Sequence, residues 1–125
     1  MEKFVACLNC MDGRVQEPVI SWVKENLGIP FVDMITEPGI DGLLGRNSEE
    51  EIPPSILAKL QVSIEKPGSK TVIVVGHYDC AGNPVDENTH KEHLRVAVEK
   101  IRKLYPELTV IGLWVSEKFR AERWF

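Results

Sequence analysis

Two short motifs in this sequence contain residue types that bind metal ions. The first is Cys10-Met11-Asp12-Gly13-Arg14, which directly follows an apolar, strand-like run. The second is His77-Tyr78-Asp79-Cys80, which directly follows another such run. Thiolate sulfur and imidazole nitrogen are ligands that Zn²⁺ prefers. Cys10, His77 and Cys80 are therefore the candidate metal ligands, and Zn²⁺ is the predicted cofactor.

Asp12 and Arg14 lie close enough to this ligand set to take part in its chemistry. Three protein ligands leave the fourth position of a tetrahedral zinc site open, as in catalytic zinc sites. Asp12 could fill that position, or Arg14 could hold its carboxylate bidentately and keep it ionised. A carboxylate held in this way can accept a hydrogen bond from a metal-bound water. We predict Asp12 and Arg14 as catalytic residues; the alternative is an exposed ion pair worth ~0–1 kcal/mol.

Cys7 allows a second interpretation of the cysteines. It forms a Cys-x-x-Cys pair with Cys10, and with His77 and Cys80 it could complete a closed, four-ligand structural zinc site. Side chains alternate along a β-strand, so residues three apart point to opposite faces. We therefore predict that Cys7 fills the core. The same alternation argues against a thioredoxin-like redox motif, in which the pair should open a helix.

Four apolar runs rich in β-branched residues predict the strands that position these motifs. They cover residues 4–9, 31–36, 71–76 and 109–115. The third run is apolar without alternation, which is typical of a strand buried on both faces of a parallel sheet. Apolar residues at helical spacing predict helices at 15–27 and 55–65. A further helix begins near the capping box Thr89-His90-Lys91-Glu92, where His90 and His93 fit a solvated helix start better than a second metal site.

Strands that alternate with helices imply right-handed crossovers and an α/β fold. We predict a three-layer sandwich with a central, mostly parallel sheet of about four strands, in the order 2-1-3-4, flanked by helices. In such a sheet, ligands bind beyond the carboxyl ends of the strands, so both motifs meet in one crevice. Residues 37–54 are predicted to be a functional or mobile loop, and Gly39, Gly42 and Gly45 a flexible lid or rim. Residues 116–125 fit a helix or a strand.

Length, charge and cysteine content narrow the class of protein. A chain of 125 residues suits a single domain, predicted to span 1–125. The net charge of −4 excludes a broadly basic nucleic-acid binder. No apolar run approaches the ~20 residues that span a bilayer, and the N-terminal residues lack the apolar region of a signal peptide. Three cysteines cannot form a full disulfide framework, which predicts a cytoplasmic protein. Charge and hydropathy add the expectation that it has no nucleic-acid or membrane partner.

The two motifs resemble those of the β-class carbonic anhydrases. That family carries Cys-x-Asp-x-Arg after its first strand and His-x-x-Cys after a later one, and residues 74–77 and 112–115 also resemble family segments. The resemblance implies Zn²⁺ bound by Cys10, His77 and Cys80, with Asp12 and Arg14 as a dyad. It implies reversible hydration of CO₂ to bicarbonate by a zinc-bound hydroxide. A homodimer or higher homo-oligomer is expected from the family and because symmetric dimers are the commonest oligomers.

The chain resembles a compact, divergent member of that family. Gly13 stands where the family usually has Ser, and residues 35–39 read Ile-Thr-Glu-Pro-Gly where it commonly has an Arg-Asn-Ala-Gly-like segment. The chain is short for the family and lacks its N-terminal helical extension. Two alternatives follow. One is a non-catalytic zinc-binding protein with Asp12 as fourth ligand, and the other is a zinc hydrolase of another small molecule such as carbon disulfide.

Overall fold

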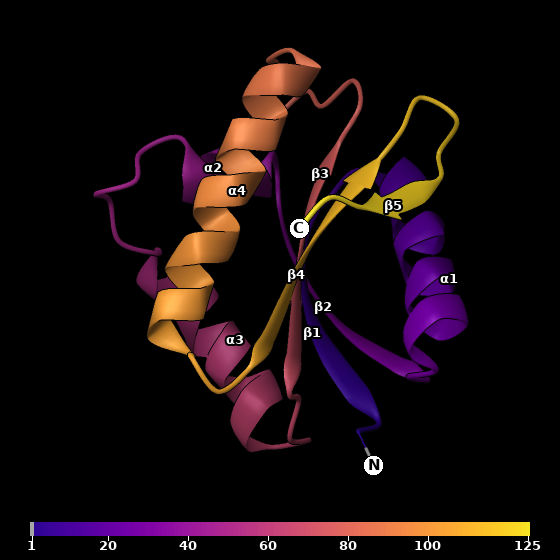
Figure 1. The fold of residues 1–125 in the computed structure, drawn as a ribbon, viewed down its shortest axis with the longest axis vertical. Helices are drawn as coiled ribbons and strands as arrows, with labels where there is room; N and C mark the ends of the chain where they lie inside the picture. The colour runs from indigo at the N-terminus through magenta and orange to yellow at the C-terminus, as the bar shows by residue number, and fades with distance from the viewer. Residues whose placement is uncertain (1) are drawn as a thin grey trace.

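A central sheet lies between two layers of helices in the computed structural model, which describes residues 2–125 (Figure 1). Within these residues, five strands form one sheet in the order β2-β1-β3-β4-β5. The strands are β1 (Phe4–Cys10), β2 (Phe31–Glu37), β3 (Thr71–His77), β4 (Thr109–Val115) and β5 (Ala121–Arg123). The first four pair in parallel, and β5 runs antiparallel to β4. The predicted fold class is confirmed. The additional strand, β5, lies in residues 116–125, the segment that fitted either a helix or a strand.

The helices divide unequally between the two faces of the sheet. On one face, the 3-10 helix η1 (Gly13–Val15) leads into α1 (Gln16–Leu27), which packs against one hydrophobic cluster. On the other face, a second cluster joins the sheet to α2 (Ile40–Gly45), α3 (Pro54–Glu65) and α4 (Glu87–Leu104). Every residue of β3 is buried, because this strand is covered on both faces. This burial explains why apolar and polar residues do not alternate in the sequence of β3.

Helix α2 occupies part of residues 37–54, which were predicted to be a functional or mobile loop with a flexible glycine lid or rim, and it shows that this part is not a flexible lid. Gly39 precedes α2 with a φ of +59°, a conformation that glycine adopts without steric cost. A Cβ atom at Gly45 would clash with the backbone carbonyl of His93 in α4. The glycines therefore allow α2 to pack closely against α4 instead of making this part of the segment mobile.

The start of α4 also differs from the prediction. Its N-cap is Asp86, whose carboxylate accepts a hydrogen bond from the backbone N–H of Thr89 at 2.8 Å. Asp is among the strongest N-cap residues, so the helix begins three residues before the predicted capping box. His90 consequently lies inside the helix and is buried rather than solvated.

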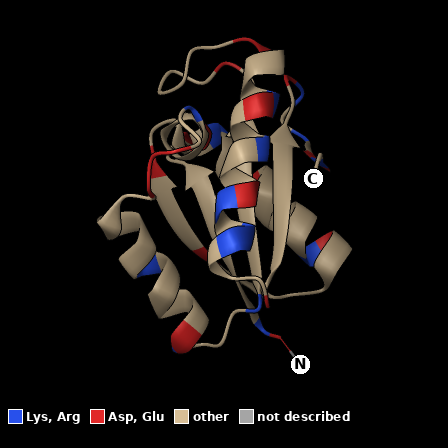
Figure 2. Cartoon of the chain, turned by 60° about the vertical axis from the view of Figure 1, so that its left-hand side comes forward, with Lys and Arg blue, Asp and Glu red and all other residues tan. Residues whose placement is uncertain are grey.

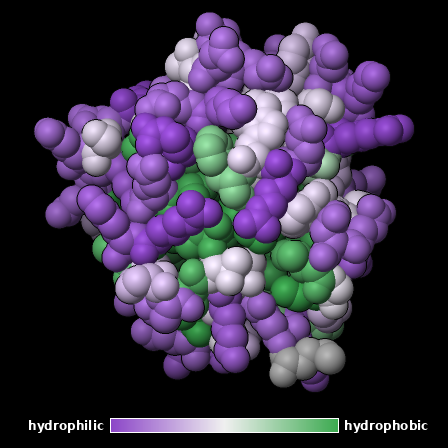
Figure 3. Space-filling view, viewed as in Figure 1, coloured by the Kyte–Doolittle hydropathy of each residue, from purple (hydrophilic) through white to green (hydrophobic). Residues whose placement is uncertain are grey.

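The surface is mixed in character. Charged residues of both signs lie along the outward face of α4, where Arg95 pairs with Glu92 and Glu99 (Figure 2). On the face seen in Figure 3, apolar residues gather near the centre and polar residues surround them. Among residues 2–125, no helix combines the length and the apolar character needed to cross a membrane.

Candidate metal centre

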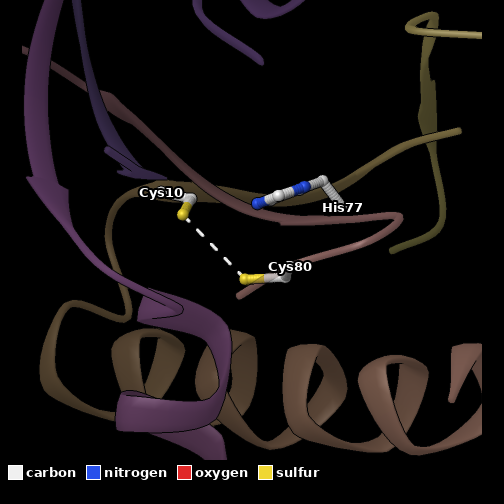
Figure 4. Close-up of side chains that lie close together, drawn as sticks. All are labelled: Cys10, His77 and Cys80. Atoms are coloured by element: carbon white, nitrogen blue, oxygen red, sulfur yellow. Dashed lines mark hydrogen bonds between the residues drawn. The ribbon is translucent and has the colours of Figure 1, made fainter. Parts of the chain in front are cut away.

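Cys10, His77 and Cys80 meet at the carboxyl ends of two neighbouring strands. Cys10 ends β1, His77 ends β3, and Cys80 follows in the turn after β3 (Figure 4). Because β1 and β3 pair in parallel, these ends lie at the same edge of the sheet. One candidate ligand atom from each residue lies within 4.8 Å of the others, and all three residues are buried. The structure thus brings together the three residues predicted as ligands, as a group that could hold a metal ion.

His77 is oriented as a metal-binding histidine would be. Its Nδ1 lies 2.8 Å from the carbonyl oxygen of Tyr78. A carbonyl only accepts hydrogen bonds, so Nδ1 carries the proton and Nε2 carries a lone pair. Within residues 2–125, this buried Nε2 has no hydrogen-bond partner. An unsatisfied buried acceptor costs about 1–3 kcal/mol, which a bound cation would recover. A carbonyl partner on the second ring nitrogen is the usual support of metal-bound histidines.

The two thiols form a tight pair. Their sulfur atoms are 3.9 Å apart. The hydrogen bond that the Cys80 thiol donates is the largest of the effects that lower the pKa of Cys10 to about 4, against the opposing effect of burial. His77 and the backbone N–H of Gly39, which is 3.4 Å from the Cys10 sulfur, contribute to the same lowering. The pKa of Cys80 is raised by the same hydrogen bond and by burial. The pair therefore holds one negative charge readily, and a cation is needed to stabilise two thiolates.

Gly39 is a contributor that sequence reasoning missed. It lies in the segment that departs from the family pattern, and its N–H group points at the Cys10 sulfur. A Cβ atom at Gly39 would clash with the backbone of Gly82, so only glycine fits this position. Its backbone N–H was hidden from motif analysis because a main-chain donor leaves no residue-type signature.

Arg14 holds Asp12 at the rim of the centre. The guanidinium Nη2 is 2.7 Å from Asp12 Oδ2, and Nε lies 3.1 Å from Oδ1. The backbone N–H of Arg14 also donates to Oδ1, at 2.9 Å. These hydrogen bonds lower the pKa of Asp12 to about 2. The Asp12 carboxylate is therefore ionised at neutral pH, with both of its oxygens engaged by Arg14.

Arg14 also links the two motifs, which their spacing in the sequence did not suggest. Its Nη1 lies 3.3 Å from the Asp79 carboxylate, and its Nη2 donates to the Asp79 carbonyl at 3.1 Å. Asp79 has a φ of +56°, in the left-handed region that residues with a side chain rarely adopt. The arginine contact thus stabilises the strained turn between His77 and Cys80.

Cys7 lies outside the candidate ligand group. It is fully buried in the hydrophobic cluster beneath α1, and burial raises the pKa of its thiol. The prediction that Cys7 fills the core is confirmed. A closed site that also includes Cys7 is not the arrangement seen among residues 2–125.

The fold is similar to that of solved carbonic anhydrases. A β-carbonic anhydrase from Trichomonas vaginalis superposes with a TM-score of 0.67 at 14% identity, covering 98% of this chain and 82% of that one. A carbonic anhydrase from Streptococcus mutans gives a TM-score of 0.63 at 17% identity, covering 98% and 81%. An apo carbon disulfide hydrolase gives 0.64 at 16% identity, covering 97% and 77%. No curated protein sequence matches the chain.

A family comparison extends this likeness from the fold to the sequence. The family described as "Putative carbonic anhydrase" matches residues 1–124. This match covers both motifs and all the elements that carry them. The solved structures independently show the same arrangement of sheet and helices. The chain belongs to this carbonic anhydrase family and has the β-carbonic anhydrase fold.

Proposed function

We propose that this protein binds Zn²⁺ through Cys10, His77 and Cys80 and catalyses the reversible hydration of CO₂ to bicarbonate. The observation that carries the proposal is that a ring nitrogen of His77 lies within 4.8 Å of two cysteine sulfurs, in a buried ring whose Nε2 has no hydrogen-bond partner. Sulfur and imidazole ligands favour Zn²⁺ over hard cations. Membership of the carbonic anhydrase family supports the assignment of the reaction.

The residues around the ligands suit this reaction. Zn²⁺ held by three protein ligands supplies a water whose pKa falls to about 7, and so a nucleophile at neutral pH. Asp12 stays ionised and accepts a hydrogen bond at the open side of the site. Arg14 engages both oxygens of Asp12, so the carboxylate would have to give up these hydrogen bonds to bind a metal ion. This supports an open fourth position over the alternative in which Asp12 is a permanent fourth ligand.

Hydrolysis of carbon disulfide is the second candidate reaction and is assayed in parallel. The carbon disulfide hydrolase shares its fold with this chain at 16% identity. Carbon disulfide and CO₂ are both small linear molecules with an electrophilic carbon, so one site of this type can accept either in principle. Residues 35–39, which differ from the usual family segment, stand beside the centre through Gly39 and are candidates for such a difference in substrate.

We also propose that the protein forms a homodimer or a higher homo-oligomer. Two β-carbonic anhydrases from Sordaria macrospora, one of which shares this fold at 14% identity, are described as tetrameric. Met11, beside the proposed ligand Cys10, is 61% exposed, and Phe31 on the edge strand β2 is 52% exposed. Large apolar side chains exposed in this way are common at protein interfaces.

Stopped-flow measurement of CO₂ hydration tests the proposed reaction. Protein with a quantified zinc content is assayed from about pH 6.5 to about pH 9, a range that brackets the expected pKa of the zinc water. We expect zinc-dependent turnover that rises with pH. Asp12→Asn should lower turnover on the order of 10²-fold while leaving the zinc content unchanged.

Two results would contradict the proposal. A full zinc content with no turnover of CO₂ at any pH would reject carbonic anhydrase activity. Turnover of carbon disulfide under the same conditions would then identify the hydrolase. Loss of zinc in Asp12→Asn would instead identify Asp12 as a ligand and the site as closed.

A further inference from the structure

The turn between β4 and β5 contains a bulky residue with a strained backbone. Phe119 has a φ of +55°, in the left-handed region that residues with a side chain rarely adopt. Its N–H donates to the carbonyl oxygen of Ser116 at 2.9 Å, and the N–H of Ser116 donates to the carbonyl oxygen of Arg120 at 3.0 Å. A hairpin loop that pairs such a turn with a left-handed residue favours glycine at that position. The backbone alone therefore selects against phenylalanine here.

Burial of the Phe119 ring does not explain the choice of residue. The residue is 42% exposed, and within residues 2–125 it belongs to neither of the two hydrophobic clusters. Glycine would relieve the strain and would remove little from the core. A backbone outlier that core packing does not repay points to a role for the side chain outside the core.

The Phe119 ring lies against the guanidinium of Arg14. The Cζ atom of Arg14 is above the ring, 5.5 Å from its centroid. A guanidinium within about 6 Å of an aromatic centroid is attracted by the negative face of the ring. Both residues line a cavity of about 880 Å³, which lies where the β4–β5 turn approaches α1 (Figure 1). The strained residue thus contacts the arginine that joins the two motifs.

Arg14 needs a contact of this kind because other carboxylates compete for it. Its side chain is 45% exposed, although it donates to both Asp12 and Asp79. Glu17 and Glu25 line the same cavity as Arg14. Neither glutamate forms an ion pair within residues 2–125. A guanidinium that left Asp12 would find these carboxylates on the side of the cavity.

We propose that Phe119 is a positioning residue that holds the Arg14 guanidinium against Asp12 and Asp79. Its ring makes a cation–π contact with Arg14, and Arg14 in turn holds the Asp12 carboxylate at the rim of the metal centre. The aromatic ring is kept in the turn despite the strain, because glycine offers no face to the guanidinium. The consequence for turnover rests on the proposed function, whereas the effect on Arg14 depends on neither zinc nor a reaction.

Three substitutions separate the ring of Phe119 from its bulk and from its backbone. Phe119→Tyr keeps the ring and the strain. Phe119→Leu keeps the strain and most of the apolar bulk but removes the ring. Phe119→Asn removes the ring and relieves the strain, because asparagine is enriched at positive φ. The matched control is Phe31→Leu, which removes another exposed ring from the opposite end of the sheet, where β2 begins.

The first measurement is the exchange with water of the Arg14 Nε–H proton, followed in ¹H–¹⁵N spectra of the purified protein. The signal is assigned by its loss in Arg14→Lys. We expect exchange to be faster by about two- to fivefold in Phe119→Leu and Phe119→Asn, the factor that an exposed cation–π contact supplies. Phe119→Tyr and Phe31→Leu should keep the original rate. The asparagine variant should melt no lower than the leucine variant, so that a general loss of stability cannot explain its faster exchange.

The second measurement is CO₂ hydration by the zinc-loaded protein. Phe119→Leu should lower turnover by about two- to fivefold with an unchanged zinc content, and Phe119→Tyr should restore it. In protein that already carries Asp12→Asn, Phe119→Leu should lower turnover no further. The two changes are not additive, because Phe119 acts through the contact between Arg14 and Asp12.

Four outcomes would overturn the proposal. Unchanged exchange of the Arg14 proton in both the leucine and the asparagine variants would show that Phe119 does not hold Arg14. Exchange as fast in Phe119→Tyr as in Phe119→Leu would show that the ring is not the cause. Equally faster exchange in Phe31→Leu would show a general loosening of the fold. A full effect of Phe119→Leu on turnover in Asp12→Asn protein would show that Phe119 acts by another route.

Failure of the proposed function is distinguished from failure of this proposal. If the unsubstituted protein does not hydrate CO₂, the proposed reaction is rejected. The exchange of the Arg14 proton then decides the role of Phe119 by itself.

Discussion

At the residue scale, the chemistry of the candidate metal centre depends on side-chain atoms that lack a hydrogen-bond or charge partner within the protein. His77 uses one ring nitrogen on the carbonyl of Tyr78 and leaves the other without a partner. Cys10 gains thiolate character from the hydrogen bond that Cys80 donates, and Cys80 loses it for the same reason. A cation bound between the three side chains would supply a partner for the free nitrogen of His77 and for the negative charge of the cysteine pair.

Two cysteine variants separate the roles of the proposed ligand and the core cysteine. We expect Cys10→Ser to lose stoichiometric zinc, because serine replaces a soft thiolate with a poor ligand for Zn²⁺. Cys7→Ser should keep its zinc, because Cys7 lies in the hydrophobic cluster beneath α1. The measurement is zinc content by elemental analysis after gel filtration. If Cys7→Ser also lost its zinc while still folded, the assignment of Cys7 to the core alone would be wrong.

At the scale of the elements, α4 carries a histidine whose hydrogen bond depends on its neutral form. His93 Nδ1 accepts from Asn83 Nδ2 at 3.0 Å, and Asn83 also binds Asp41 of α2. Burial lowers the pKa of His93 from its ordinary value of 6.5, and the charge of Asp41 only partly offsets this. Nearby His90 and Arg46 lower it further. The contact between α2 and α4 thus includes a pH-sensitive hydrogen bond.

The pKa shift of His93 predicts a loss of stability in mild acid. Unfolded His93 takes up a proton near pH 6.5, whereas the folded residue does so only at lower pH. The free energy of unfolding therefore falls as the pH is lowered through 6.5 toward the folded pKa. Urea unfolding at about pH 7.5 and about pH 5.5 measures this fall. His93→Gln, which retains an acceptor but does not titrate, should show a smaller fall, and an equal one would refute the prediction.

At the scale of the whole molecule, the fold does not rest on the candidate metal centre. Two hydrophobic clusters, one on each face of the sheet, join all the larger helices to the strands. Cys10 and Cys80 belong to one of these clusters, but the other members of both clusters are apolar residues that need no metal to pack. The chain is therefore expected to fold without metal, unlike small zinc domains whose folding requires it.

Removal of metal by a chelator tests this independence. The far-ultraviolet circular dichroism spectrum should stay unchanged, while the melting temperature should fall. Bound zinc adds about 4 kcal/mol to the free energy of unfolding when its free concentration is about 1,000 times the dissociation constant. Collapse of the spectrum on chelation would show that metal is required for folding. An unchanged melting temperature would show that zinc does not bind the native state.

The proposed oligomer is tested by mass. Sedimentation equilibrium should give at least twice the chain mass of 14.1 kDa, with dissociation only on strong dilution. A mass of 14.1 kDa throughout the accessible concentration range would refute the homo-oligomer. The proposed single domain over 1–125 predicts in addition that unfolding follows one cooperative transition.

Much of the fold could be predicted from local patterns. Short apolar runs rich in β-branched residues predicted β1 to β4 to within a residue or two, because such side chains suit a pleated strand that packs against its neighbours. The helix α2 was missed because two of its six residues are glycines, which have a low helix propensity. Its helical form depends on packing against α4, which no local pattern records.

The sequence by itself determined the candidate ligands, the strand ends on which they lie and the resemblance to the family, because residue chemistry and strand periodicity are local properties. Only the tertiary structure decided which nitrogen of His77 is free, that Arg14 links Asp12 to Asp79, and that His90 pairs with Asp41. These contacts join segments far apart in the chain or depend on the orientation of a ring. They arise when helices and strands close against one another, and side-chain spacing along the chain does not encode them.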